Sequence, residues 1–288
     1  MIRDGSKVSI EELSWMPNRA KIFTRGLLHA STILRQMRGF WRGYTTWRYR
    51  NPWKAPGDRK DAPDQTNPLR LYFDEHTTGP GIWKWRHYFD VYDRHLGRFR
   101  DRPVRVLEIG IYSGGSLQMW RNYFGPSCEI HGVDIESACK AYENESVRVF
   151  IGDQGDRNFW TRFKQEIQAV DIVIDDGAHL PEQQIVTFEE LLPHLRPGGV
   201  YICEDIHGTL NTFAAYVYGA AQNLNACDQG RENTDNNERR LVYGASPFQS
   251  AVRSIHLYPF VTVVERTEAP ISELVSAKHG TQWQPFLK

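Results

Sequence analysis

The chain has 288 residues, of which 40% are hydrophobic and 24% are charged, an ordinary composition for a globular protein with a sizeable core. Its four cysteines show neither C-x-x-C spacing nor a matching histidine pattern, which argues against a disulfide framework or a zinc site and favours a reducing cytoplasm. No apolar run reaches the roughly 18 residues of a membrane-spanning helix, and the N-terminus lacks the hydrophobic region of a signal peptide.

The first 50 residues form a basic arm. They contain ten Lys and Arg residues against three acidic ones, so the arm carries +7 and the rest of this formally neutral chain carries −7. Such an arm can fold back on the acidic body, bind a neighbouring subunit or contact an anionic surface. Pairing with its own body or with a sister subunit is the simpler interpretation. The basic, aromatic segment from Lys21 to Trp41 keeps weak membrane contact as the alternative.

The arm continues into a predicted linker. A helix is expected over about Arg19–Phe40, and the stretch Asn51–Asn67 is rich in Pro, Gly and Asp, which are typical of linkers. We therefore expect residues 1–65 to form an N-terminal arm and linker, and no motif within them indicates a function.

A dense group of aromatic residues follows, from Leu69 to Phe99. Its second half, GIWKWRHYFDVYDRHLGRF, has helical spacing, so residues 66–103 are expected to form an aromatic helical cap. Trp83 and Trp85 could stack on a sugar or fill the core, and we expect them to fill the core.

From residue 104 to residue 288 the pattern becomes regular. Short runs rich in β-branched residues alternate with helical stretches, which predicts βαβ units and a parallel sheet with right-handed crossovers. Near the end, RSIHLYPFVTVVERT predicts two adjacent strands with a turn near Pro259, an antiparallel pair at the sheet edge. The expected fold is therefore a doubly wound, mostly parallel α/β sheet with a helical N-terminal extension. The parallel runs are VRVLEIGI, EIHGVDI, VRVFIGD, VDIVIDDG and GGVYICED.

Residues suited to a nucleoside stand at successive strand ends, where an open parallel sheet binds its ligands. The glycines after the first run permit a tight turn and close approach of a ligand, although Tyr112 replaces the second glycine of the dinucleotide fingerprint. Asp134 can accept hydrogen bonds from both ribose hydroxyls, and Asp153-Gln154 suit an adenine edge. Singly, each could be a turn or a helix cap, but their order predicts a nucleoside cofactor. The expected cofactor-binding residues are Glu108, Gly110, Tyr112, Ser113, Ser116, Asp134, Asp153, Gln154 and Asp175.

Carboxylates follow the fourth and fifth runs. Adjacent strand ends would bring Asp176, Glu204 and Asp205 together, where they would repel one another unless a cation neutralised them. Oxygen ligands favour a hard ion such as Mg²⁺. His179, three residues beyond Asp176, is suited to act as a general base. The alternatives are acids that cap helices or pair with Arg and Lys, and a histidine that caps the helix opening at Pro181.

The span from about Gly81 to Thr267 resembles the metal-dependent sugar O-methyltransferases of macrolide biosynthesis, of the macrocin and mycinamicin type. Its specific part is VIDDGAH followed by PGGVYICED. The other matching segments are VLEIGIYSGGSLQMWRNYFG, HGVDIE, GDQGD and SIHLYPF.

The resemblance implies a Rossmann-like methyltransferase with S-adenosylmethionine as cofactor and a sugar-containing small molecule as acceptor. It also implies Mg²⁺ held by Asp176, Glu204 and Asp205, with His179 as the base. The segment around Lys84–His95 would help to enclose cofactor and substrate. Because such enzymes often form oligomers, a homo-oligomer is expected. In the implied reaction the metal binds two neighbouring hydroxyls, His179 takes a proton, and the alkoxide attacks the methyl group.

Other functions share this pattern. Catechols and other vicinal diols can also chelate Mg²⁺, and the site resembles proteins described as cephalosporin hydroxylases. A non-catalytic cofactor-binding scaffold is disfavoured by the intact acidic segments. A role of the basic arm in binding nucleic acid is disfavoured by the acidic body. The polar stretch Asn223–Gln249 is a candidate lid that would contribute to acceptor choice.

Overall fold

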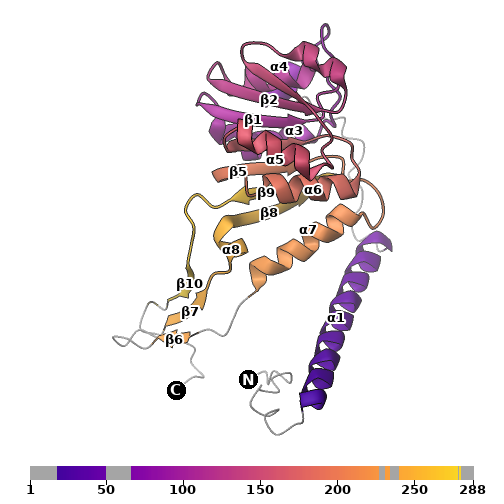
Figure 1. Ribbon diagram of the computed structural model, residues 1–288, viewed down its shortest axis with the longest axis vertical. Coiled ribbons are helices and arrows are strands. Elements are labelled where there is room, and N and C mark those ends of the chain that lie inside the picture. The colour runs from indigo at the N-terminus through magenta and orange to yellow at the C-terminus, as the bar shows by residue number, and fades with distance from the viewer. Residues whose placement is uncertain (1–17, 50–65, 227–230, 234–239, 278, 280–288) are drawn as a thin grey trace. The chain divides into compact units, whose positions relative to one another are not determined.

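The computed structural model describes residues 18–49, 66–226, 231–233, 240–277 and 279 (Figure 1). The chain divides into two compact units, Met1–Ala62 and Pro63–Lys288. Most of the predicted linker lies outside the described residues. Within them, no helix is both long and apolar enough to cross a membrane.

The first unit contains one long helix, α1 (Asn18–Tyr49). The helix expected from the sequence ended at Phe40, and α1 instead continues for more than two further turns. Gly39 and Gly43 do not end it, because isolated glycines lower helix stability by only about 1 kcal/mol each and no proline interrupts the segment. The extension adds Trp41, Tyr44 and Trp47 to the helix.

The second unit is built on a seven-stranded sheet with the order β3-β2-β1-β4-β5-β9-β8 (Figure 1). Strands β1 to β5 are parallel, whereas β9 runs antiparallel to both β5 and β8. The predicted parallel sheet and its antiparallel edge pair are therefore confirmed. The strands are β1 (Val104–Ile109), β2 (Cys128–Asp134), β3 (Val147–Ile151), β4 (Val170–Asp175), β5 (Leu195–Cys203), β8 (Val252–Tyr258) and β9 (Val261–Arg266).

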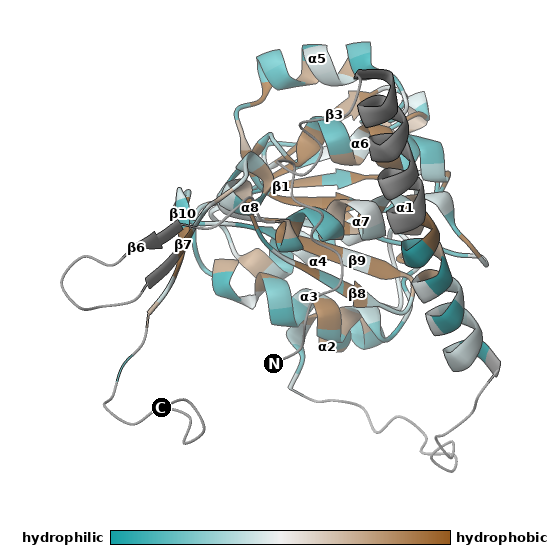
Figure 2. Cartoon of the chain, turned by 90° about the horizontal axis from the view of Figure 1, so that it is seen from below, coloured by the Kyte–Doolittle hydropathy of each residue, from teal (hydrophilic) through white to brown (hydrophobic). Residues whose placement is uncertain are grey.

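Helices cover both faces of the sheet. One apolar core lies under α2, α3 and α4, and a second lies under α5, α6 and α7. In Figure 2 the strands are mostly hydrophobic, and they lie among helices with hydrophilic faces. The helices are α2 (Pro68–Glu75), α3 (Tyr88–Leu96), α4 (Gly115–Phe124), α5 (Arg157–Glu166), α6 (Pro181–Leu191), α7 (Thr212–Gln222) and α8 (Pro247–Ala251).

The segment ahead of β1 departs from the predicted helix. Of the residues between Gly81 and Phe99, only α3 is α-helical, followed by a single 3-10 turn at Gly97–Phe99. Trp83 is exposed, Lys84 is buried and Trp85 is again exposed, the alternation of an extended backbone. The prediction was wrong here because the aromatic spacing does not reveal that the Lys84 side chain is held by distant acids.

The candidate lid is partly ordered into strands. Strand β7 (Arg240–Gly244) pairs with both β6 (Arg231–Asn233) and β10 (Glu273–Ser276) in a separate three-stranded sheet. The remainder of the stretch contains α8 and residues that lie outside the described part. Its role as a lid stays a prediction.

Candidate functional site

A cavity of about 940 Å³ opens at the carboxyl ends of the parallel strands in the second unit. Backbone hydrogen bonds join these ends in sequence: Gly110 N to Val133 O (2.8 Å), Asp176 N to Ile109 O (3.0 Å) and Glu204 N to Asp175 O (2.9 Å). The loops that follow β1, β2, β3, β4 and β5 therefore meet at one rim. This is where ligands bind in open α/β sheets.

The loop after β1 is held against Asp134. One carboxylate oxygen, Oδ2, accepts the backbone N–H groups of Ile111 (2.8 Å) and Tyr112 (3.0 Å), and Oδ1 accepts that of Glu136 (2.9 Å). Asp134 still lines the cavity, so the carboxylate that was expected to bind ribose also shapes the glycine loop. Ser113 lines the same wall.

Gly110 is the position in this loop where a side chain is least tolerable. Its φ is +86°, and a Cβ atom would lie 2.0 Å from the backbone oxygen of Asp176. We expect Gly110→Ala to lower the free energy of unfolding by at least about 1–3 kcal/mol and to weaken cofactor binding.

The matched control is Gly219→Ala in α7, where a Cβ meets nothing within 4 Å. There alanine is expected to stabilise by roughly 0.5–1 kcal/mol. Chemical denaturation of both variants checks the pair, and equal stabilities would contradict the assigned close approach.

Two of the predicted cofactor-binding residues lie behind the cavity wall. Glu108 and Asp175 are fully buried and do not line the cavity. Glu108 accepts a hydrogen bond from Ser116 Oγ (2.8 Å), and Asp175 accepts one from Tyr201 OH (2.9 Å). Burial raises the pKa of Asp175 to about 7. These two acids therefore support the loops of the cavity wall from behind and do not contact a ligand in the cavity directly.

Gln154 lines the cavity, but both ends of its amide are engaged. Its Nε2 donates to Asp175 Oδ1 (3.0 Å), and its Oε1 accepts the backbone N–H of Ala178 (2.7 Å). Gln154 therefore ties the ends of β3 and β4 together. Asp153 also lines the cavity and caps its own turn through Gly155 N (2.7 Å).

The predicted base and two of the predicted metal ligands converge. His179 Nε2 lies 3.5 Å from Asp205 Oδ2 and 3.9 Å from Asp176 Oδ1. Ligand atoms of these three residues all lie within 4.8 Å of one another. Helix α6 has Leu180 at its N-cap and no capping hydrogen bond from a side chain there. The geometry therefore favours the role of His179 in the acidic cluster over that of a helix cap.

Glu204 faces a different partner, Lys84, which the sequence reasoning missed. Lys84 Nζ lies 3.0 Å from Glu204 Oε2, 2.6 Å from Asp176 Oδ2 and 3.8 Å from Glu108 Oε1, with 3% of its side chain exposed. Burial alone would lower the pKa of Lys84, but the three carboxylates outweigh it and raise the pKa above its ordinary range. A buried ammonium is thus built into the acidic site.

The same short segment supplies further donors to the acids. Tyr92 OH donates to Glu204 Oε1 (2.6 Å), and Tyr88 OH donates to Asp205 Oδ1 (2.6 Å). Trp85 Nε1 donates to the same oxygen of Asp205 (2.9 Å). Residues 84–92 therefore orient all three of the acids that were predicted to bind metal, whereas the resemblance implied only an enclosing role for this segment.

Strained backbone gathers at the rim. Tyr112, His179 and Asp205 have φ values of +47°, +56° and +54° although none is glycine. Such conformations cost of order 1–3 kcal/mol each and persist where the surroundings impose them, often at functional sites. All three residues line the cavity.

The donor set fits a hard divalent cation. Glu108, Asp176 and Glu204 surround one ammonium, so acidic groups outnumber it, and Glu108 Oε1 is buried without a hydrogen-bond partner. Burial also raises the pKa of Glu204. Asp176 Oδ1 and Asp205 Oδ2 are the carboxylate oxygens that face His179 Nε2, and carboxylate oxygens are the ligands that Mg²⁺ prefers. Glu204 is a more distant member of this set, since both its oxygens are engaged.

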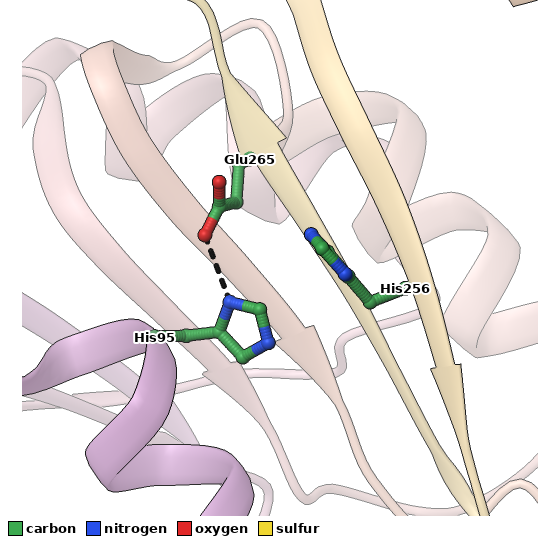
Figure 3. Close-up of side chains that lie close together, drawn as sticks. All are labelled: His95, His256 and Glu265. Carbon is green, nitrogen blue, oxygen red and sulfur yellow. Dashed lines mark hydrogen bonds and ion pairs between the residues drawn. The ribbon is translucent and has the colours of Figure 1, made fainter.

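A second polar cluster ties α3 to the edge of the sheet (Figure 3). His95 Nδ1 lies 2.8 Å from Glu265 Oε1, and its Nε2 lies 2.9 Å from the Tyr258 hydroxyl. His256 Nε2 lies 3.0 Å from Ser254 Oγ. Burial raises the pKa of Glu265, but the hydrogen bond from His95 together with the positive charges of Arg98, His95 and His256 outweighs burial, so the pKa is lowered. Because these groups satisfy one another, the cluster serves to fix α3, which carries Tyr88 and Tyr92.

Comparison with known proteins matches the site region to a methyltransferase. Residues 107–206 match the family model described as a methyltransferase domain. The chain is 42% identical over 132 residues to a demethylmacrocin O-methyltransferase of Streptomyces fradiae, covering 43% of this chain and 33% of that protein. It is 39% identical over 158 residues to a mycinamicin VI 2''-O-methyltransferase of Micromonospora griseorubida, covering 52% and 37%. The chain thus spans less than half the length of these two relatives.

A solved structure extends the likeness to the fold. The MycE methyltransferase of the mycinamycin pathway, in complex with Mg, SAH and mycinamycin VI, superposes with a TM-score of 0.54 at 27% identity. The superposition covers 72% of this chain and 55% of that one. The chain therefore has a Rossmann-like methyltransferase fold similar to that of sugar O-methyltransferases.

Proposed function

We propose that this chain is an S-adenosylmethionine- and Mg²⁺-dependent O-methyltransferase that acts on a hydroxyl of a sugar or glycosylated natural product. The observation that carries the proposal is the convergence of Asp176, His179 and Asp205 beside a glycine loop of the methyltransferase type. The sugar O-methyltransferases and the Mg- and SAH-containing structure described above support the acceptor class and both cofactors.

S-adenosylmethionine would lie along the wall formed by the loop after β1 and the end of β2. Gly110 allows the backbone to come close to it, and Asp134 and Asp153 are placed to accept hydrogen bonds from the nucleoside. When bound, the cofactor supplies a methyl group on a sulfonium sulfur. Cavity-lining hydrophobic side chains next to this wall, such as Val133 and Ile135, suit the flat faces of an adenine ring.

Mg²⁺ would be held by Asp176 and Asp205. Glu204 would not contact the ion while Lys84 and Tyr92 occupy its two carboxylate oxygens. Bound there, the ion would lower the pKa of a coordinated hydroxyl and offset the excess of negative charge. His179 Nε2 lies beside both acids and can accept the hydroxyl proton, and the neighbouring carboxylates stabilise the imidazolium that results.

The acceptor would meet aromatic residues at the mouth of the cavity. Trp83 is 85% exposed and lines this mouth, so our expectation that it fills the core was wrong. Trp85 is 47% exposed and contacts the rings of His207 and Phe260. Flat apolar surfaces beside an acidic centre suit a sugar ring, which presents both C–H faces and hydroxyls.

Calorimetry with S-adenosylhomocysteine, with and without Mg²⁺, tests the cofactor and metal parts of the proposal. We expect the wild type to bind the nucleoside, and Asp176→Asn to retain that binding while losing uptake of Mg²⁺. Rhamnosylated and other glycosylated acceptors are then compared with catechols under defined metal. Methylation of catechols alone would make a catechol the acceptor in place of the sugar. Binding of S-adenosylhomocysteine without methylation of any acceptor would leave a cofactor-binding scaffold, and failure to bind it would overturn the proposal.

Three predictions about the wider context also stay proposals. We expect a homo-oligomer, a cytoplasmic enzyme and no affinity for nucleic acid. The acidic charge of residues 51–288 supports the last of these, because a surplus of acids repels phosphates.

A further inference from the structure

Helix α1 carries a continuous apolar face. Residues 33, 37, 40, 44 and 47 are spaced by four, three, four and three positions, which places them on one side of a helix. Ile33, Met37, Phe40 and Trp47 are between 43% and 61% exposed. Leu34 and Trp41 widen the same face. Among the described residues of this unit, which are those of α1 itself, these side chains are thus largely exposed to solvent.

The face is rich in aromatic residues. Phe40 stacks on Tyr44 with ring centroids 6.3 Å apart, and Trp41 meets Tyr44 edge-on at 5.8 Å. Trp47 lies one turn further along. Tryptophan and tyrosine combine an apolar ring with a polar N–H or O–H group, and they collect at the boundary between water and lipid.

The polar side of the helix has charge of one sign. Arg35, Arg38 and Arg42 are spaced by three and four positions and fall opposite the apolar face. Over its full length α1 contains no Asp or Glu at all. Its Lys and Arg residues are Arg19, Lys21, Arg25, Arg35, Arg38, Arg42 and Arg48.

From this combination we propose that α1 lies flat on an anionic lipid bilayer, with its apolar face in the headgroup boundary and its arginines against lipid phosphates. A basic polar side opposite an aromatic and aliphatic face is the composition of interfacial helices. α1 is not apolar enough to span a bilayer, in keeping with a surface position. At 1.5 Å per residue its 32 residues would extend about 48 Å along the surface.

A second copy of the chain fits this helix less well. Two copies packed through α1 would bring together two helices that carry only positive charge, and nothing on either could form the interhelical ion pairs of coiled coils. The apolar face is also wider than the two positions per heptad of a coiled-coil seam. An anionic lipid surface can bury the apolar face of α1 and also place lipid phosphates beside its arginines.

Vesicle flotation of the full-length chain tests the proposal. Phosphatidylcholine vesicles with and without phosphatidylglycerol are compared at low and at physiological salt. We expect binding to the anionic vesicles, weakened by salt, and at least roughly tenfold weaker binding for the double variant Arg38→Glu/Arg42→Glu. Phe40→Ser/Trp41→Ser should also lose binding, because it removes apolar area from the face.

The matched control is Arg162→Glu, an exposed position in α5. It should bind vesicles like the wild type, and all variants should keep the wild-type affinity for S-adenosylhomocysteine, since α1 belongs to the other unit. A wild type that floats with neither vesicle overturns the proposal. So does a double arginine variant that binds as the wild type does, or a change in oligomeric size without vesicle binding, which would assign α1 to a second copy.

Discussion

Replacing His179 by alanine is expected to lower the turnover number by roughly 10²–10⁴-fold, the usual contribution of a general base. His179 Nε2 lies within 4 Å of both Asp176 and Asp205, and the residue lines the cavity. Its backbone is held at a φ of +56°, so the loop presents this side chain at a conformational cost. Steady-state kinetics at saturating cofactor measure the effect, and affinity for S-adenosylhomocysteine should change little.

A matched control lies on the opposite side of the same acid. His207 Nε2 is also 3.5 Å from Asp205, but its ring packs against Phe260 and Trp85 and it is not part of the cluster with Asp176. His207→Ala should therefore retain most of the turnover. If the two variants exchange their effects, His207 is the base. If both keep full turnover, the reaction proceeds without a histidine base.

Replacing Lys84 by methionine is expected to lower the free energy of unfolding by about 3–5 kcal/mol, the cost of removing one partner from a buried ion pair. Methionine preserves much of the side-chain volume, so the loss isolates the charge. Without the ammonium, Asp176, Glu204 and Glu108 would be left buried without their counter-ion. The acids raise the pKa of Lys84 above its ordinary value, so this stabilisation is fully present at neutral pH and is lost only as the pH rises through that raised value.

Lys164→Met is the control for the loss of a lysine. Lys164 Nζ pairs with Glu190 at 2.6 Å, but 29% of its side chain is exposed, so the pair should be worth about 1 kcal/mol or less. Urea denaturation compares the two variants. Mg²⁺ should raise the melting temperature of Lys84→Met more than that of the wild type, because the variant has a larger excess of negative charge. Equal stabilities of the two variants would show that Lys84 is not a structural cation of the site.

Much of the site followed from residue order along the chain. Asp134, Asp153, Asp176 and the pair Glu204-Asp205 each come directly after or at the end of a β-branched run. Because the carboxyl ends of adjacent parallel strands share one edge of a sheet, their order along the chain predicts their proximity in space. The grouping of Asp176 with His179 and Asp205 was accessible for the same reason.

The direction in which each side chain points could not be predicted from residue order. Glu204 and Asp205 are neighbours in sequence and both line the cavity, yet Glu204 is fully buried against Tyr92 while Asp205 is partly exposed beside His179. Adjacent residues leaving a strand point to opposite sides, and which side faces the ligand depends on what packs there. The motif assigned both acids the same role, and the structure gives them different surroundings.

The sequence alone determined the doubly wound sheet, its antiparallel edge and the edge of the sheet at which the predicted site residues lie. Strand patterning and loop residues are local properties, which a sequence records directly. The tertiary structure alone decided the role of Lys84, which lies 92 residues from Asp176 and 120 from Glu204 along the chain. It also decided that the backbone around Trp83 is extended and that α1 reaches Tyr49. Such long-range ion pairs leave no periodic trace in a sequence, since their energy depends on burial and distance in the folded chain.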